Sequence, residues 1–87
     1  MKKINKIHKW HCDPGHAWLE VEIKDLKKLN IDKDISNYSY INGNYAYLEE
    51  DCDAFVYIKA LEKKKISYSY DEISYDDSCF IRSYDHY

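Results

Sequence analysis

Apolar and polar residues alternate over two short stretches near the start of the chain, a pattern typical of half-buried β-strands. The stretches are residues 7–12 and 17–23, and Asp13-Pro14-Gly15 lies between them. Proline presets φ and glycine supplies a positive φ, so this tripeptide predicts a tight turn. We therefore expect a pair of strands, of which the second directs four residues toward the core: Ala17, Leu19, Val21 and Ile23.

Two other stretches carry apolar residues at the spacing of an amphipathic helix. The first is short and covers about residues 24–30. The second begins in the acidic run at 49–53 and continues to about Lys64. Acidic residues at its start and lysines at its end suit the helix dipole, and Asp51 or Asp53 is the expected N-cap. The residues expected on its inward stripe are Ala54, Phe55, Ile58 and Leu61.

The segment between these helices predicts a β-hairpin. Asn42-Gly43 separates two alternating runs and favours a type I′ turn, which needs a positive φ at both central residues. A turn at that position opposes the tyrosines in pairs, Tyr40 with Tyr45 and Tyr38 with Tyr47. Opposed residues share one face of a sheet, so the four rings would form a tyrosine platform. Ser39 and Ala46 would leave the other face open to a helix.

Two further strands are expected at residues 66–70 and 80–84, with a loop at 71–78 between them. The element order is then β-β-α-β-β-α-β-β. This order predicts one small α+β domain over residues 7–87, with an antiparallel or mixed sheet and two helices on one face. The basic residues 1–6 are expected to form a flexible tail.

The composition indicates what kind of surface this domain presents. The 87 residues include ten tyrosines and two tryptophans, and the net charge is −3. Arg82 is the only arginine, so a phosphate-binding stripe for nucleic acid is not expected. No stretch is apolar and long enough to cross a bilayer, and no signal peptide is visible. We therefore expect a cytoplasmic protein, with no membrane or nucleic-acid partner, whose acidic surface suits a basic protein.

Three segments of the chain stand out as motifs. They are Trp-His-Cys-Asp-Pro-Gly-His-Ala-Trp-Leu at 10–19, Tyr-Ala-Tyr-Leu-Glu-Glu-Asp-Cys-Asp at 45–53 and Ile-Arg-Ser-Tyr at 81–84. Together they resemble a family of small, uncharacterised proteins of bacteriophages, prophages and other mobile elements. The resemblance implies a protein that binds a host protein or sequesters a host signal. It also implies which positions matter most: Trp10, Gly15, His16, Trp18, Tyr38, Tyr40, Tyr47, Asp51, Asp53, Arg82 and Tyr84.

Metal binding is one alternative. Zinc takes histidine and cysteine ligands, of which the chain offers His8, His11, Cys12, His16, Cys52, Cys79 and His86. On a strand, however, His8 and His11 point to opposite faces, and the sequence has no Cys-x-x-Cys pair. We therefore predict no metal or cofactor, and we expect His8 and His11 to lie on the surface.

Catalysis is a second alternative. The three cysteines are expected to be reduced thiols, and Cys52 lies near a helix N-terminus, which lowers a thiol pKa. The carboxylates of the acidic run 49–53 oppose that effect, so we expect Cys52 to be a small buried residue under the helix. The same run could supply acid–base groups or hold a divalent cation, but helix capping explains it more simply.

Arg82 is the single residue that most specifically suggests ligand binding. Beside Tyr84 and His86, its planar fork could clamp a phosphate or a carboxylate. Alternatively, it pairs with a carboxylate of the acidic run 49–53. That run would then tie the first turn to the last strand by accepting bonds from His16 or Arg82.

These features favour a binding protein over an enzyme. Trp10 and Trp18 belong to one predicted hairpin, so we expect them to cluster and to bind a protein or a stacked base. The leading hypothesis is an inhibitor that docks on a host protein of antiviral defence, such as a CRISPR effector. The alternatives are a sponge for a nucleotide-type signal at a homo-oligomer interface and a small metal-binding module. The predicted binding residues are Tyr38, Tyr40, Tyr45, Tyr47, Trp10, Trp18, His16, Arg82, Tyr84, Asp51 and Asp53.

Overall fold

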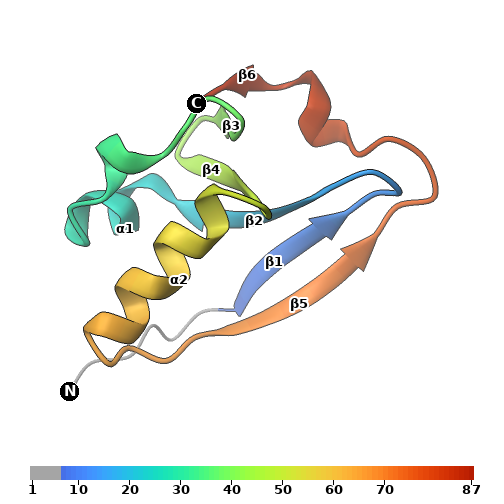
Figure 1. Ribbon diagram of the computed structural model, residues 1–87. Helices are drawn as coiled ribbons and strands as arrows, with labels where there is room; N and C mark the ends of the chain where they lie inside the picture. The colour runs from blue at the N-terminus through green and yellow to red at the C-terminus, as the bar shows by residue number, and fades with distance from the viewer. Residues whose placement is uncertain (1–6) are drawn as a thin grey trace.

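The computed structural model describes residues 7–87 as one β-sheet with two α-helices on one face (Figure 1). Its strands are β1 (Ile7–Cys12), β2 (Ala17–Glu22), β3 (Tyr40–Asn42), β4 (Tyr45–Glu49), β5 (Ser69–Ser74) and β6 (Asp85–His86). Its helices are α1 (Ile23–Lys28) and α2 (Asp53–Lys63), with 3-10 helices η1 (Asp32–Asp34) and η2 (Phe80–Ser83). The predicted α+β class and element order are confirmed. The tail expected at residues 1–6 lies outside the described residues.

The sheet is mixed, because β5 runs parallel to β1 while the other described pairs are antiparallel. The strand order is β5-β1-β2-β4-β3-β6, and α2 carries the chain from β4 across the face of the sheet to β5. The strand expected at 66–70 and the loop at 71–78 are wrong, since 69–74 form β5. This edge strand buries no full face, so it lacks the alternation that reveals β1 and β2.

The main core lies between the sheet and the two helices. It is built from aliphatic residues of alternate sheet positions and from the helix residues that face them: Leu19, Val21, Ala46, Leu48, Leu26, Ala54, Tyr57 and Leu61. Phe55 does not belong to it, contrary to expectation, and is 58 % exposed. The inward stripe of α2 instead runs through Ala54, Tyr57 and Leu61, which are three and four residues apart. The Tyr57 hydroxyl forms a hydrogen bond with His8 Nε2, at a distance of 3.0 Å between the two atoms.

A second, aromatic cluster lies on the opposite face of the sheet. The C-terminal segment folds back over this face, and the buried residues of the cluster are Trp18, Tyr47, Cys79 and Ile81. Residues 80–84, expected as a strand, form η2 and a short connection to β6. The segment therefore covers the sheet with side chains and pairs with it only at Asp85 and His86.

The hairpin turn is displaced by one residue from the predicted position. Its central residues are Gly43 and Asn44, and only Gly43 has a positive φ, +61°, as at the first position of a type II′ turn. Tyr40 consequently lies opposite Tyr47. The shift moves each pairing by two residues, so Tyr40, Tyr45 and Tyr47 still share a face, whereas Tyr38 lies in a turn before β3.

Asp53 holds the start of α2 against the segment that leads into β3. Its carboxylate accepts the backbone N–H of Ser36 at 3.0 Å, the Ser36 hydroxyl at 2.7 Å and the Ser39 hydroxyl at 2.5 Å. Ser39 Oγ in turn accepts the backbone N–H of Glu49 at 3.0 Å. The expected N-cap role is therefore wrong for both Asp51 and Asp53, because Cys52 occupies that position. Asp53 is a buried structural residue and not part of an exposed site.

Replacing Asp53 by asparagine should lower the free energy of unfolding by about 2–4 kcal/mol, because a buried charged acceptor with several donors is lost. Urea denaturation followed by tryptophan fluorescence measures the change. Asp51→Asn is the matched control, since the Asp51 side chain is exposed and accepts no bond among the described residues. Equal stability of the two variants would contradict the role of Asp53.

Candidate functional site

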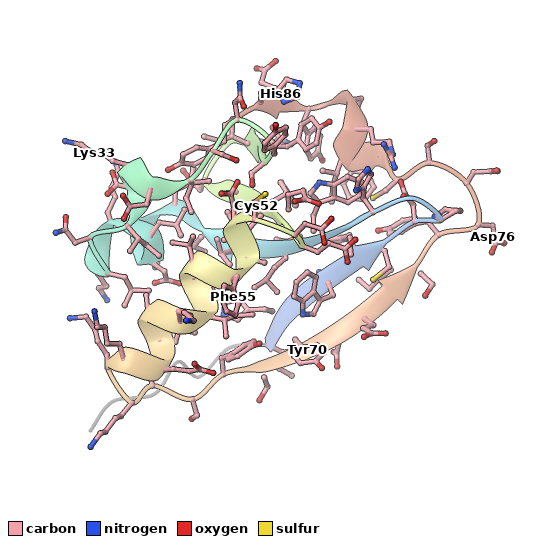
Figure 2. All side chains as sticks on the ribbon, in the orientation of Figure 1. Lys33, Cys52, Phe55, Tyr70, Asp76 and His86 are labelled. Atoms are coloured by element: carbon pink, nitrogen blue, oxygen red, sulfur yellow. The ribbon has the colours of Figure 1, made fainter. Side chains whose placement is uncertain are left out.

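A cleft of about 430 Å³ opens between the start of α2 and the C-terminal segment, where Figure 2 labels Cys52 and His86. Residues from β2, β3, β4, η2 and β6 and from the turns beside them line it: His16, Trp18, Tyr38, Tyr40, Glu49, Asp51, Cys52, Arg82 and His86. We call this the aromatic cleft. Its volume lies within the range of about 300–1,000 Å³ that is usual for ligand pockets.

An ion pair between Asp13 and Arg82 closes one side of the aromatic cleft. Arg82 Nε lies 2.7 Å from Asp13 Oδ2 and Arg82 Nη2 lies 2.9 Å from Oδ1, so the pair is bidentate. The same carboxylate accepts the backbone N–H groups of Cys79, Gly15 and His16, each at 2.9 Å. The Arg82 bond, followed by these backbone bonds, holds the pKa of Asp13 well below its usual range.

Gly15 is needed in this turn for space. Its φ is not positive, contrary to the sequence prediction. A Cβ at this position would lie 3.0 Å from Arg82 Nη2, closer than side-chain atoms normally approach. Glycine therefore lets the guanidinium reach Asp13 across the turn.

Trp18 contributes the most buried side chain of the aromatic cleft, at 2 % exposure. The Arg82 guanidinium carbon lies 5.2 Å from its ring, and the rings of His16 and Tyr40 lie 5.9 and 6.1 Å away. Trp18 Nε1 is the one buried side-chain nitrogen or oxygen within residues 7–87 that has no hydrogen-bond partner. The indole is thus fixed by its neighbours but keeps an unused donor.

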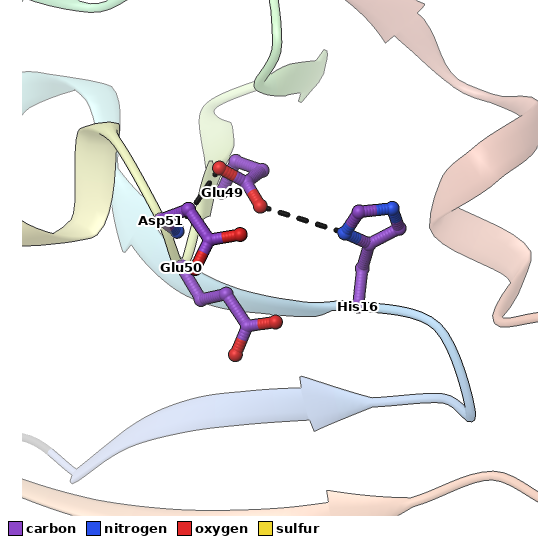
Figure 3. A group of neighbouring side chains, drawn as sticks. All are labelled: His16, Glu49, Glu50 and Asp51. Atoms are coloured by element: carbon purple, nitrogen blue, oxygen red, sulfur yellow. Dashed lines mark hydrogen bonds and ion pairs between the residues drawn. The ribbon is translucent and has the colours of Figure 1, made fainter.

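Carboxylates form the opposite wall of the aromatic cleft, at the turn between β4 and α2 (Figure 3). Glu49 is buried, accepts the Asp51 backbone N–H at 3.0 Å and lies 3.5 Å from His16 Nδ1. Ligand atoms of His16, Glu49, Glu50 and Asp51 all lie within 4.8 Å of one another. Among the described residues, this group is where a cation would be held best.

The charges around the aromatic cleft do not balance. Asp13 neutralises Arg82, and His86 Nδ1 donates to the Asn37 carbonyl at 2.8 Å. No lysine or arginine of the described chain pairs with Glu49, Glu50 or Asp51. The cleft is therefore negative as well as aromatic.

Six of the predicted binding residues meet in the aromatic cleft: His16, Trp18, Tyr38, Tyr40, Asp51 and Arg82. The others do not. Tyr47 and Tyr84 pack in the second cluster, with Tyr47 only 6 % exposed, and Tyr45 lies farther along the sheet. The tyrosine platform is therefore divided into a buried and an exposed part.

Two further expectations about aromatic and basic residues are wrong. Trp10 and Trp18 do not cluster, because Trp10 lies opposite Leu19 and Trp18 opposite His11, on different faces of the sheet. Arg82 does not pair with the acidic run 49–53, because Asp13 in the first turn reaches it.

The zinc ligands considered from the sequence are not brought together. His8 and His11 lie on opposite faces, as predicted, but both are buried and not on the surface. His11 Nε2 lies 2.8 Å from Glu20 Oε1, and its Nδ1 lies 2.9 Å from the Tyr75 hydroxyl. Each imidazole is thus engaged by hydrogen bonds to side chains of the fold: His11 as just described, and His8 through the Tyr57 hydroxyl.

Cys52 is exposed, contrary to expectation. Its pKa is raised by desolvation of the thiol and by the negative charges of Glu49 and Asp53, so a thiolate nucleophile is disfavoured. Cys12, Cys52 and Cys79 are all free thiols.

The sequence did not reveal the parts played by Asp13 and Glu49. Asp13 begins an Asp-Pro-Gly turn, where aspartate is common for local reasons that give no sign of a distant arginine. Glu49 belongs to the acidic run, and its place at the end of β4 buries it, whereas Glu50 and Asp51 are exposed. His86 also lines the cleft, and its position near Arg82 in sequence was the available signal.

Comparison with known proteins finds no match for the chain, whether among family models, curated proteins or solved structures. The resemblance to a bacteriophage protein family stays a prediction. Within residues 7–87, every helix is too short or too polar to span a bilayer.

The Asp13–Arg82 pair predicts how stability depends on pH. Because folding lowers the pKa of Asp13, the unfolded chain binds more protons than the folded one once the pH falls near the ordinary aspartate value of about 4. The contribution of Asp13 is therefore complete above that pH and is lost as the pH falls below it.

Urea unfolding between pH 2 and pH 6 should show a steeper acid loss of stability for the native protein than for Asp13→Asn. The asparagine variant lacks the titrating carboxylate, so its curve should be lower at pH 6 and flatter below pH 4. Parallel curves for the two proteins would show that the pair does not carry this dependence.

Proposed function

We propose that this chain is a non-enzymatic binding domain that docks on a partner protein and receives a basic side chain of that partner in the aromatic cleft. The observation that supports it best is that Glu49 and Asp51, carboxylates with which no described lysine or arginine pairs, share one cleft with the rings of Trp18, Tyr38 and Tyr40. A lysine or arginine side chain uses both features, since its charge pairs with carboxylates and also interacts favourably with aromatic faces.

Tyr38 supports a protein partner because it is an exposed aromatic residue at the rim of the cleft. The residue is 67 % exposed, and its backbone N–H donates to Ser36 Oγ at 3.2 Å. Its main chain is thus fixed next to the Asp53 network while the ring remains available. Tyrosine and arginine anchors of this kind dominate the binding energy of many protein interfaces.

A nucleotide fits the aromatic cleft less well. Tyr40 and His86 are stacked at 4.7 Å, which resembles a platform for a base. However, Arg82 is already engaged by Asp13, and the nearest other charges are the carboxylates of Glu49 and Asp51. A phosphate would meet repulsion here, so the sponge hypothesis has less support than docking on a basic protein.

The identity of the partner follows only from the resemblance drawn on sequence. If that resemblance holds, the partner is a host protein and the domain acts as its inhibitor, for example against a CRISPR effector. The lining of the cleft supports the chemistry proposed for the contact, which is a basic side chain next to a surface that accepts an exposed tyrosine.

The test uses two pentapeptide probes, Gly-Gly-Arg-Gly-Gly and Gly-Gly-Glu-Gly-Gly with blocked ends. We expect the arginine peptide alone to shift the Trp18 indole Nε1–H resonance in ¹⁵N NMR spectra, because Trp18 lines the cleft. Asp51→Lys and Tyr38→Ala should each weaken this binding about tenfold, as for removal of an interface anchor.

Asp34→Lys is the control for the charge change, because Asp34 is exposed in η1 and does not line the cleft. Both Tyr38→Ala and Asp34→Lys should unfold at the same urea concentration as the native protein. Equal responses to the arginine and glutamate peptides, or unchanged affinity in Asp51→Lys, would refute the proposed function.

A further inference from the structure

The outer edge of β5 has hydrogen-bonding groups that nothing in the described chain uses. β5 is the terminal strand of the sheet, and five of its six residues are exposed (Figure 2, near Tyr70). The Tyr75 backbone N–H donates to the Cys12 carbonyl at 2.8 Å, so residues of odd number bond toward β1. The N–H and C=O groups of Tyr70, Glu72 and Ser74 therefore point outward.

Aromatic and acidic side chains flank this edge on the helix side of the sheet. A cleft of about 340 Å³ runs beside it and is lined by Trp10, Cys12, Ala17, Glu50, Tyr68, Tyr70 and Glu72. Trp10 and Tyr70 meet edge to face at 6.4 Å, and Tyr68 and Tyr70 are stacked at 6.0 Å. No ion pair involves Glu50, Asp71 or Glu72 in the part of the chain that is described.

A second copy of the chain is a poor occupant of this edge. Two β5 strands related by a two-fold axis would run antiparallel, with outward-pointing residues bonded to each other. The two registers with the greatest overlap place either Glu72 opposite Glu72 or Asp71 opposite Asp71. Identical charges directly opposed across a strand pair are destabilising, and charged residues on an edge strand commonly prevent self-pairing.

We infer that the β5 edge is a site for β-strand addition by an extended, lysine-rich segment of a partner protein. The added strand would pair with the outward groups of Tyr70, Glu72 and Ser74, and its basic side chains would meet the carboxylates of Asp71 and Glu72. On the helix side, a lysine would also lie in the cleft between Glu50 and the ring of Tyr70. The inference shares with the proposed function only the basic character of the partner.

Amide hydrogen exchange of the native protein tests this site with three hexapeptide probes: alternating Lys-Thr, alternating Glu-Thr, and alternating Lys-Pro. The lysine–threonine peptide should slow exchange at Tyr70, Glu72 and Ser74 by about tenfold, because exposed amides become hydrogen-bonded. Asp71 and Ile73 should change little. The glutamate peptide lacks the charge and the proline peptide cannot form a strand, so neither should protect these amides.

Glu72→Lys should abolish the protection, whereas Glu62→Lys, an equal charge change on exposed α2 surface, should keep it. Protection by the glutamate or proline peptide, or none by the lysine–threonine peptide, would overturn the inference. A native dimer that protects the same amides would also overturn it, because the occupant would then be a second copy. The Trp10 indole resonance reports this edge and the Trp18 resonance reports the aromatic cleft, so failure of one proposal is distinguishable from failure of the other.

Discussion

The bidentate pair between Asp13 and Arg82 is the interaction on which the rest of the site depends. It joins residues 69 positions apart in the sequence and, with the Cys79 backbone bond, fixes the C-terminal segment against the first turn. Only with that segment in place are Trp18 and Tyr47 covered. The same pair neutralises the single arginine, which leaves the carboxylates of the aromatic cleft as its dominant charges.

The sheet is covered on both faces, but with different kinds of side chain. Aliphatic residues face the helices, whereas rings, Cys79 and Ile81 cover the other face. Phenols that lose contact with water need partners, and the buried histidines supply two of them: His8 contacts the hydroxyl of buried Tyr57, and His11 that of half-buried Tyr75. Burial raises the pKa of Tyr47 and Tyr57 well above the ordinary tyrosine value. Many of the tyrosines therefore serve the fold and are not available for binding.

The sequence predicted what local periodicity determines. The alternation in β1 and β2, the two helices and the order of elements all follow from short-range patterns, and the structure confirms them. The hairpin turn was misplaced by one residue, because Asn42-Gly43 and Gly43-Asn44 are both good turn dipeptides. The prediction that Tyr40, Tyr45 and Tyr47 share one face is nevertheless correct, because moving the turn by one residue changes the strand register by two residues.

Long-range contacts account for what the sequence could not predict. Nothing near Arg82 in sequence distinguishes Asp13 from the carboxylates of the acidic run, and only the folded chain decides between them. Likewise, the burial of Tyr47 depends on η2, which lies more than thirty residues later in the chain. Six of the eleven predicted site residues still reach one cleft, since the first turn, the β3 segment and η2 converge there.

The turn at residues 49–51 explains how one partner could use both negative surfaces. Glu49 and Asp51 line the aromatic cleft, whereas Glu50 between them lines the cleft beside β5. Consecutive residues of a turn thus supply carboxylates to two neighbouring hollows, each with its own set of aromatic rings. A basic segment that lies along β5 and ends at this turn would come next to the aromatic cleft. If both proposals hold, a single basic partner would occupy the two surfaces, with strand pairing giving its direction and the aromatic cleft receiving its last basic side chain.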